Sequence, residues 1–405
     1  MVKLAWRNIW RNKRRSLITI ASVFFAFFFC VLLISMQSGA WGRMIENILR
    51  TQVGHIQVHQ KGYFDDQVID NLMTMDESKI SEIEQLKNVA YISPRLETFA
   101  MASYGNSNKA VALVGIDPAR ENRMSHLSDR VVSGNYLTPE DSNGILVGKK
   151  LSEYLQIQSG DTVALISQGY HGASANGLFI VRGIVSLVTP EMDQNFIYTT
   201  IPAAQEFVGL ENGFSALLIT LDNENRLSQS LKEISDHLDT DTYEVLSWKT
   251  SMKKLLDQAA SDEIFTQIMM FILYMIVGFG ILSTVIMMTN ERRHEFGVVI
   301  ALGMQHRKLA TTMVLEMLIM IFIGIVASLL VTIPIIQYFH LNPIPMSGEL
   351  KDAMAGYGME AVFPFNNSPL LFIKQMLVVM IITIVVTIYP VRYIFKLNVI
   401  NALKN

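Results

Sequence analysis

Two histidines, His55 and His59, stand four residues apart, which on a helix is the spacing of a metal-binding pair. The segment around them alternates apolar and polar residues, however, and alternation predicts a strand with Ile56 and Val58 facing inward. On a strand, four residues span about 13 Å at ~3.3 Å per residue. One ion could not reach both rings, so we predict no metal site.

Two other short runs resemble catalytic motifs without meeting their requirements. Residues 144–150 (GILVGKK) are one residue short of a phosphate-binding loop, and Lys150 stands where a hydroxyl must hold Mg²⁺. Residues 172–176 (GASAN) resemble the G-x-S-x-G motif of a nucleophile elbow, but Asn176 stands where the motif has its second glycine. We therefore predict no catalytic residue and no cofactor bound by this chain.

The most strongly patterned polar segment is residues 290–303 (NERRHEFGVVIALG). Glu291 and Glu295 favour the start of a helix, and Gly303 suits its end, where a positive φ is needed. Such a short helix offers Phe296, Val299 and Ile300 to a partner groove. An elbow that merely lies on the membrane is the alternative.

Gly297 in this segment has no Cβ, so we expect it to face water and to let a partner surface approach closely. The residues that we expect to couple the chain to a partner are Glu291, Arg292, Arg293, Glu295, Phe296, Gly297, Ala301, Leu302 and Gly303.

The hydropathy of the sequence predicts the helices that position this segment. Half of the 405 residues are hydrophobic and only 17% are charged, against about 25% in soluble domains. Four runs of about 20 apolar residues, long enough to cross a bilayer, cover 17–36, 264–288, 317–338 and 370–389. The sequence therefore predicts an α-helical membrane protein with four transmembrane helices, and Cys30 is a buried residue of the first.

Charge predicts the orientation, because Lys and Arg concentrate in cytoplasmic loops. The short flanks on one side hold 13 of these residues, whereas the loop at 339–369 has only Lys351. Both termini should then be cytoplasmic. The predicted segments are a cytoplasmic interfacial helix (1–16), a first span (17–37), a periplasmic domain with stalk helices at both ends (38–262), a second span (263–289), a cytoplasmic coupling loop (290–314), a third span (315–338), a short periplasmic loop (339–369), a fourth span (370–390) and a cytoplasmic tail (391–405).

The domain at 38–262 mixes helical and alternating patterns, which predicts an α+β fold in two lobes. Helices are expected at 77–86 and 226–238, and strands at 109–114, 162–166, 178–185, 196–198 and 216–221, with a strand leading into a helix at 146–155. Its acidic excess argues against nucleic acid as a partner. Helical apolar stripes at 41–53 and 252–260 predict stalks that extend the first and second spans.

The run E-R-x-x-E-F-G-x-x-x-A-L-G at 291–303 resembles the coupling-helix signature of the FtsX/MacB/Lol class of ABC-transporter permeases, often called type VII. Ile300 departs from the class, which often has Arg there. The resemblance covers nearly the whole chain, with residues 263–405 similar to the FtsX-like permease domain. It implies Porter-like and Sabre-like lobes of the MacB periplasmic core type, and localisation in the bacterial inner membrane.

Residues 54–58 and 168–173 resemble the lipoprotein-releasing branch, LolC and LolE. This resemblance implies mechanotransmission from a LolD-like cytoplasmic ATPase dimer, which binds ATP and Mg²⁺, through two permease subunits, the second a copy or a paralogue. The cargo would be a lipoprotein released to a LolA-like periplasmic carrier. The hook for that carrier would include Gln168, Gly169, Tyr170, His171 and Gly172, for which an ordinary loop is the alternative.

Adaptable Met and aromatic side chains on the first two spans suit a site for lipid tails. The candidates are Phe28, Phe29, Leu32, Met36, Met269, Met270 and Leu273, with ordinary lipid-facing residues as the alternative. Two other functions within the class are open. One is MacB-like efflux, although that protein carries its own ATPase; the other is FtsX-like regulation of a periplasmic enzyme, which is expected to need a smaller outer domain.

Overall fold

The computed structural model of the 405-residue chain describes residues 2–11, 13–350 and 361–397. The predicted loop at 339–369 is therefore described only in part, and Lys351 and the end of the predicted tail lie outside the described residues. The chain forms two compact units, a helical one (Met1–Gly42, Gln258–Pro345 and Phe363–Asn405) and an α+β one (Arg43–Asp257 and Met346–Val362).

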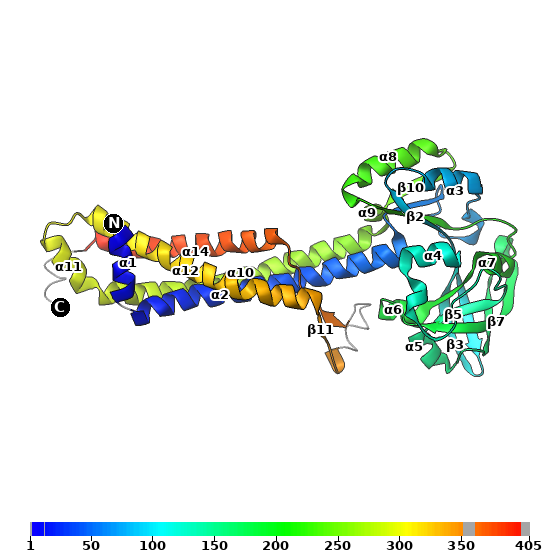
Figure 1. The fold of residues 1–405 in the computed structure, drawn as a ribbon, viewed down its shortest axis with the longest axis horizontal. Coiled ribbons are helices and arrows are strands. Elements are labelled where there is room, and N and C mark those ends of the chain that lie inside the picture. The colour runs from blue at the N-terminus through cyan, green and yellow to red at the C-terminus, as the bar shows by residue number, and fades with distance from the viewer. Residues whose placement is uncertain (1, 12, 351–360, 398–405) are drawn as a thin grey trace. The chain divides into compact units, whose positions relative to one another are not determined.

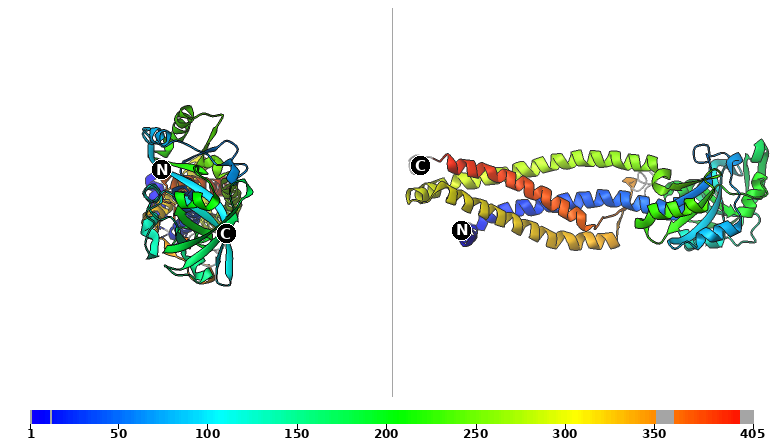
Figure 2. Two further views of the ribbon diagram at one scale, coloured as in Figure 1. Left: turned by 90° about the vertical axis from the view of Figure 1, so that its right-hand side faces the viewer. Right: turned by 90° about the horizontal axis from the view of Figure 1, so that it is seen from above.

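In the helical unit, four helices are long and apolar enough to cross a membrane. They are α2 (Lys13–Ile48), which continues into a short π-helix η1 (Leu49–Val53), α10 (Lys253–Glu291), α12 (His306–Leu341) and α14 (Pro369–Phe395). Figures 1 and 2 show α12 and α14 running alongside each other. The four predicted spans are confirmed as helices. The predicted stripe at 41–53 lies on α2 and η1, and all but the first residue of the stripe at 252–260 lies on α10.

A shared apolar core joins these helices, built from Phe27 of α2, Val285 of α10, Met317 of α12 and Val379 of α14. Gly324 allows α12 to lie against α2, since a Cβ there would meet the carbonyl oxygen of Ile20 at 3.0 Å. Small residues permit such close approach between membrane helices.

Two short helices complete the helical unit. Helix α1 (Val2–Arg11) precedes α2 and buries Ala5 and Ile9, one turn apart. Helix α11 (Arg293–Ala301) connects α10 to α12. The strands β11 (Ile344–Pro345) and β12 (Val362–Phe363) pair with each other.

The α+β unit is built on one mixed ten-stranded sheet with the order β10-β1-β9-β2-β3-β8-β5-β7-β4, and β6 pairs with β2 and β7. The strands are β1 (Ile56–Gln60), β2 (Val89–Tyr104), β3 (Ser107–Ile116), β4 (Val131–Gly134), β5 (Gly144–Gly148), β6 (Thr162–Gln168), β7 (Ser174–Val185), β8 (Phe196–Thr200), β9 (Ala216–Leu221) and β10 (Tyr243–Ser247). The helices are α3 (Glu77–Glu84), α4 (Pro118–Ser125), α5 (Lys149–Leu155), α6 (Pro190–Asn195), α7 (Ile201–Val208), α8 (Leu227–His237) and α9 (Trp248–Ser251).

Strand β2 divides this sheet between two main hydrophobic cores, in agreement with the predicted two lobes. Its first half pairs with β9 and gives Ile92 to the core under α3 and α8. Its second half pairs with β3 and gives Leu96 and Ala102 to the core that includes α5 and α7. The strands and helices predicted from sequence are present. The elements that were not predicted are this 16-residue strand, β4, β10, α4, α6, α7 and α9.

The burial of strand β1 differs in one respect from the predicted alternation of buried and exposed residues. Ile56 and Val58 are buried as predicted, yet Gln57 and His59 are buried as well. The face of β1 opposite Ile56 and Val58 is also covered, because the His59 ring contacts the Ser215 carbonyl and stacks on the ring of Tyr63. Cys30 is buried in α2, as predicted.

Candidate functional site

The segment that connects α10 to α12 has the predicted helix and the predicted glycine turn. Helix α11 spans Arg293–Ala301, and Gly303 follows with φ of +95°. The amide of Gly303 donates to the carbonyl of Ile300 at 2.9 Å, and the amide of Met304 donates to that of Val299 at 3.2 Å. These two bonds form a Schellman motif, which ends a helix and turns the chain sharply.

The face that α11 buries differs from the predicted one. Phe296 is only 2% exposed and lies in the core of the helical unit, and Gly297 is buried beside it. Ile300 also packs against this core. The expectation that Gly297 faces water, and that Phe296 and Ile300 point to a partner, is therefore wrong, because this side of α11 packs into the core of the helical unit. Val299 is half-buried and lines a cavity.

The outward face of α11 consists of other side chains. Val298 is exposed, and Leu302 is 83% exposed. His294, Val298 and Leu302 follow one another every four residues, and side chains at this spacing share one helix face. Leu302 is thus an exposed apolar side chain at the end of a helix whose opposite side is packed into the core.

A buried ion pair fixes the start of α11 to α12. The guanidinium of Arg292 donates to the carboxylate of Glu316, and both side chains are nearly inaccessible to water. The side-chain amide of Asn8 in α1 donates to the other carboxylate oxygen at 2.6 Å. Three segments far apart in sequence thus meet at Glu316, which sequence reasoning treated only as the boundary of a span.

The N-terminal helix α1 is held to this site by a second contact. Arg11 donates to the Glu295 carboxylate at 2.5 Å, although both side chains are about half exposed. Trp6 and Trp10 of α1 are exposed, as expected for a helix in the headgroup layer. Helix α1 is therefore packed against α12 as well as carrying the cationic residues predicted for an interfacial helix.

A cavity of about 440 Å³ lies between α1, α11 and α12. Its lining combines Arg7, Arg11 and His294 with apolar groups of Val299 and Met313. Of the predicted coupling residues, the structure brings Arg292, Glu295 and Phe296 together at this cavity. Glu291, Ala301, Leu302 and Gly303 are exposed, Arg293 is half-buried, and Gly297 is buried.

The candidate lipid-tail residues are only partly brought together. Phe29 of α2 and Leu273 of α10 line an apolar cavity of about 240 Å³, together with Phe25, Val277 and Ile281. Met269 is exposed, whereas Met270 is buried on another side of α10. Leu32 and Met36 pack against the core, and Phe28 is half-buried and stacks on Phe24.

The candidate hook is the tip of the β6–β7 hairpin, where Tyr170–Gly172 forms a short 3-10 turn (η4). The amide of His171 donates to the carboxylate of Asp70 at 2.8 Å. A Cβ on Gly169 would lie 2.7 Å from the carbonyl oxygen of Val208. The tip therefore rests on α7 and on the 3-10 turn η2 (Ile69–Asn71), while the side chain of His171 is exposed.

The two histidines of the opening motif have partners within the α+β unit. His55 contacts the Glu224 carboxylate at 2.8 Å, and His59 contacts the Ser215 carbonyl at 2.8 Å. Burial lowers the pKa of His59, which favours its neutral form. Within residues 2–11, 13–350 and 361–397, no three His, Cys, Asp or Glu side chains lie close enough to hold a metal ion.

Comparison with known proteins gives matches over both units. Residues 16–237 match the MacB-like periplasmic core domain, and residues 267–399 match the FtsX-like permease C-terminal family. The lipoprotein-releasing system transmembrane protein LolC of Neisseria meningitidis is 20% identical over 71% of this chain and 69% of its own length. An uncharacterised ABC transporter permease of Methanocaldococcus jannaschii is 19% identical over 78% of each chain.

Solved structures also resemble the α+β unit. The periplasmic region of MacB from Actinobacillus actinomycetemcomitans matches with a TM-score of 0.37 and 15% identity, covering 53% of this chain and 98% of that one. The extracellular domain of the transporter YknZ from Gram-positive bacteria matches with a TM-score of 0.35 and 16% identity, over 48% and 100% of the two chains.

Proposed function

Since the chain belongs to the family of type VII ABC transporter permeases, with a MacB-like periplasmic core domain and an FtsX-like C-terminal domain, we propose that it is the membrane subunit of a transporter that releases lipoproteins. A separate ATPase hydrolyses ATP on the cytoplasmic side. The α+β unit lies on the periplasmic side and passes the lipoprotein from the outer leaflet to a soluble carrier.

The observation that carries this proposal is the geometry of α11. Its inner face is fixed by Phe296 and by the Arg292–Glu316 pair, while Val298 and Leu302 face outward. A partner that pushes on this outer face would move α10 and α12 directly, because one residue joins α11 to α10 and four residues join it to α12. That arrangement suits the transfer of force from an ATPase to membrane helices.

The choice of lipoprotein as cargo rests on two observations. The LolC relative, 20% identical, is named for a lipoprotein-releasing system. The apolar cavity at Phe29 and Leu273 provides a surface on which an acyl chain could lie. A second copy or a paralogue would enclose such a chain from the other side.

The chain carries no phosphate-binding loop motif, so ATP hydrolysis should require a second subunit. Affinity purification of the tagged chain in mild detergent, followed by identification of the bound proteins, tests this first. We expect an ABC ATPase in the eluate and a second permease subunit. Purified chain that hydrolyses ATP alone would contradict the proposal.

A release assay tests the cargo. The purified complex is placed in proteoliposomes with a reporter protein that bears an N-terminal diacylglyceryl-cysteine, and the soluble fraction is assayed after addition of ATP and a carrier. ATP-dependent appearance of the reporter supports lipoprotein release. Export of a hydrophobic dye without the reporter would indicate MacB-like efflux, and hydrolysis with neither would indicate FtsX-like regulation.

A further inference from the structure

A buried arginine lies where the first long helix ends in the α+β unit. The helix reaches Val53 as the π-helix η1, and Gly54 then leaves it with φ of +64°. The last carbonyl groups of a helix have no partner within the helix and need donors from elsewhere. The guanidinium of Arg95 in β2 supplies them, donating to Thr51 at 2.7 Å and to Gln52 at 3.1 Å.

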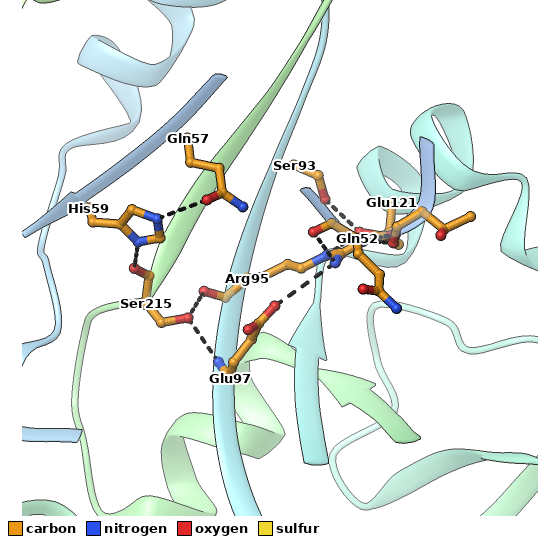
Figure 3. A network of polar contacts seen from close by, with 9 residues as sticks. Gln52, Gln57, His59, Ser93, Arg95, Glu97, Glu121 and Ser215 are labelled. Atoms are coloured by element: carbon orange, nitrogen blue, oxygen red, sulfur yellow. Dashed lines mark hydrogen bonds and ion pairs between the residues drawn. The ribbon is translucent and has the colours of Figure 1, made fainter. Parts of the chain in front are cut away.

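The same guanidinium also binds the carboxylate of Glu121 in α4. Arg95 Nε donates to one carboxylate oxygen at 3.0 Å and Nη2 donates to the other at 2.7 Å, while the Ser93 hydroxyl adds a bond of 2.9 Å. Arg95 and Glu121 are each only 1% exposed. Figure 3 shows the Arg95 side chain pointing toward Glu121 and Gln52.

The backbone of Arg95 continues the network into β9 and β1. The carbonyl of Arg95 accepts from the Ser215 hydroxyl, and the carbonyl of Ser215 contacts the His59 ring (Figure 3). Burial alone would lower the pKa of Arg95, but the Glu121 carboxylate raises it above its ordinary value, so Arg95 remains charged. The end of the helix is thus joined to β2 and α4 through one charged group.

Buried ion pairs are poor sources of stability, because removing both charges from water costs about as much as their attraction returns. Apolar residues of similar size would often stabilise such a position equally well. They could not bind two helix carbonyls in a fixed direction, whereas a planar guanidinium with five donors can. The arrangement therefore favours a role in position over a role in stability alone.

We propose that Arg95 and Glu121 are positioning residues that lock the end of the first membrane helix to the α+β unit, so that this unit follows each displacement of the helix. This inference rests on the proposed function, since the displacement comes from ATP hydrolysis at the other end of the helix. When the lock is loosened, ATP hydrolysis continues and the lipidated cargo is no longer released efficiently.

Arg95→Lys is the variant that tests the lock. Lysine keeps the positive charge, but it cannot make two parallel hydrogen bonds to Glu121 and also donate to the two helix carbonyls. Arg182→Lys is the control for changing an arginine of an ion pair elsewhere in the α+β unit, at a side chain that is 47% exposed. Arg182 donates to the largely buried Asp141 at 2.7 Å in the same unit, far in sequence from η1. Glu121→Gln is a second variant that keeps the shape of the site if Arg95→Lys fails to fold.

Two measurements distinguish a positioning role of Arg95 from a role in the stability of the fold alone. The first is reporter release per ATP hydrolysed, in proteoliposomes containing the complex and the diacylglyceryl-cysteine reporter. We expect Arg95→Lys to lower this ratio about tenfold while ATP hydrolysis stays within about twofold of the parent. The second is the width of the distance distribution between spin labels at positions 50 and 154, which should broaden in Arg95→Lys and not in Arg182→Lys.

The possible outcomes separate the two proposals. If the parent complex releases no reporter, the proposed function fails, and the spin-label distances still decide whether the lock exists. If the parent releases reporter and Arg95→Lys matches it in ratio and in width, the lock is refuted. Equal losses in Arg182→Lys and Arg95→Lys would refute it too, because they would indicate general destabilisation.

Discussion

At the scale of single residues, Glu316 is the residue at which three helices of the helical unit come into contact. Its carboxylate accepts from Arg292 and from Asn8, so that α10, α12 and α1 meet at one buried charge. Arg292→Met leaves this carboxylate without its cation. We expect a loss of about 3–5 kcal/mol of stability, as is usual when one partner of a buried pair is removed.

The measurement is the melting temperature of the purified chain in detergent. Arg50→Met is the control, because Arg50 pairs with Glu46 at 2.7 Å on an exposed surface, where such pairs contribute about 0–1 kcal/mol. A melting temperature for Arg292→Met equal to that of Arg50→Met would contradict the structural role given to Glu316.

A second prediction concerns His59, whose pKa is lowered from its ordinary value of 6.5 by burial. The unfolded chain therefore binds a proton more readily than the folded chain, so this residue destabilises the fold as the pH falls below about 6.5. We expect the melting temperature to fall less between pH 7.5 and pH 5.5 in His59→Gln than in the parent.

Single residues also show what sequence could and could not predict in α11. Gly303 was predictable, because a glycine after a short apolar helix is typical of a turn with positive φ, and the structure has φ of +95° there. Which side of α11 is buried was not predictable from the sequence. Both faces carry apolar residues, Phe296 on one and Leu302 on the other, and only contact with α12 selects between them.

At the scale of elements, long apolar runs were the most predictable, since a span of about 20 residues has few alternative structures. The strands near 109–114, 178–185 and 216–221 were also predictable from their composition. Strand β2 was not, because Pro94, Arg95 and Glu97 interrupt its apolar pattern. The buried Arg95 is explained by its contacts with η1 and α4, which lie 26 or more residues away in sequence.

The hairpin of β6 and β7 gives a prediction at this scale. Its tip is tied down by the bond between the His171 amide and Asp70. Asp70→Ala removes one partly exposed hydrogen bond, which is worth about 1 kcal/mol, so amide exchange at residues 169–173 should accelerate about fivefold. Hydrogen–deuterium exchange followed by mass spectrometry measures this.

Asp66→Ala, at a neighbouring exposed acidic residue, is the control for that experiment. If the hairpin tip is a carrier hook, loosening it should also change the binding of a carrier protein. Exchange that is equally slow in Asp70→Ala and in the parent would show that the Asp70 contact does not hold the tip.

At the scale of the whole molecule, the account requires that α11 and the α+β unit face opposite sides of the membrane. Asn135→Cys and Leu302→Cys place thiols at exposed positions of the two units, in a chain whose only other cysteine, Cys30, is buried. A membrane-impermeant maleimide applied to spheroplasts should label position 135 and not position 302. The reverse pattern would invert the predicted topology.

The central claim is that a separate ATPase acts on the outward face of α11, and the amount of ATPase that co-purifies with two α11 variants tests it most directly. Leu302→Asp places a charge on the exposed face, whereas Phe296→Ala opens a cavity on the buried face. We expect Leu302→Asp to keep the parent melting temperature and to retain about tenfold less ATPase.

Phe296→Ala should instead lower the melting temperature, because truncating a buried Phe costs about 3–5 kcal/mol. The two variants therefore separate a binding surface from a structural contact within one helix. If Leu302→Asp retains as much ATPase as the parent and supports the same ATP-driven release, the outward face of α11 is not where the ATPase acts, and the central claim is contradicted.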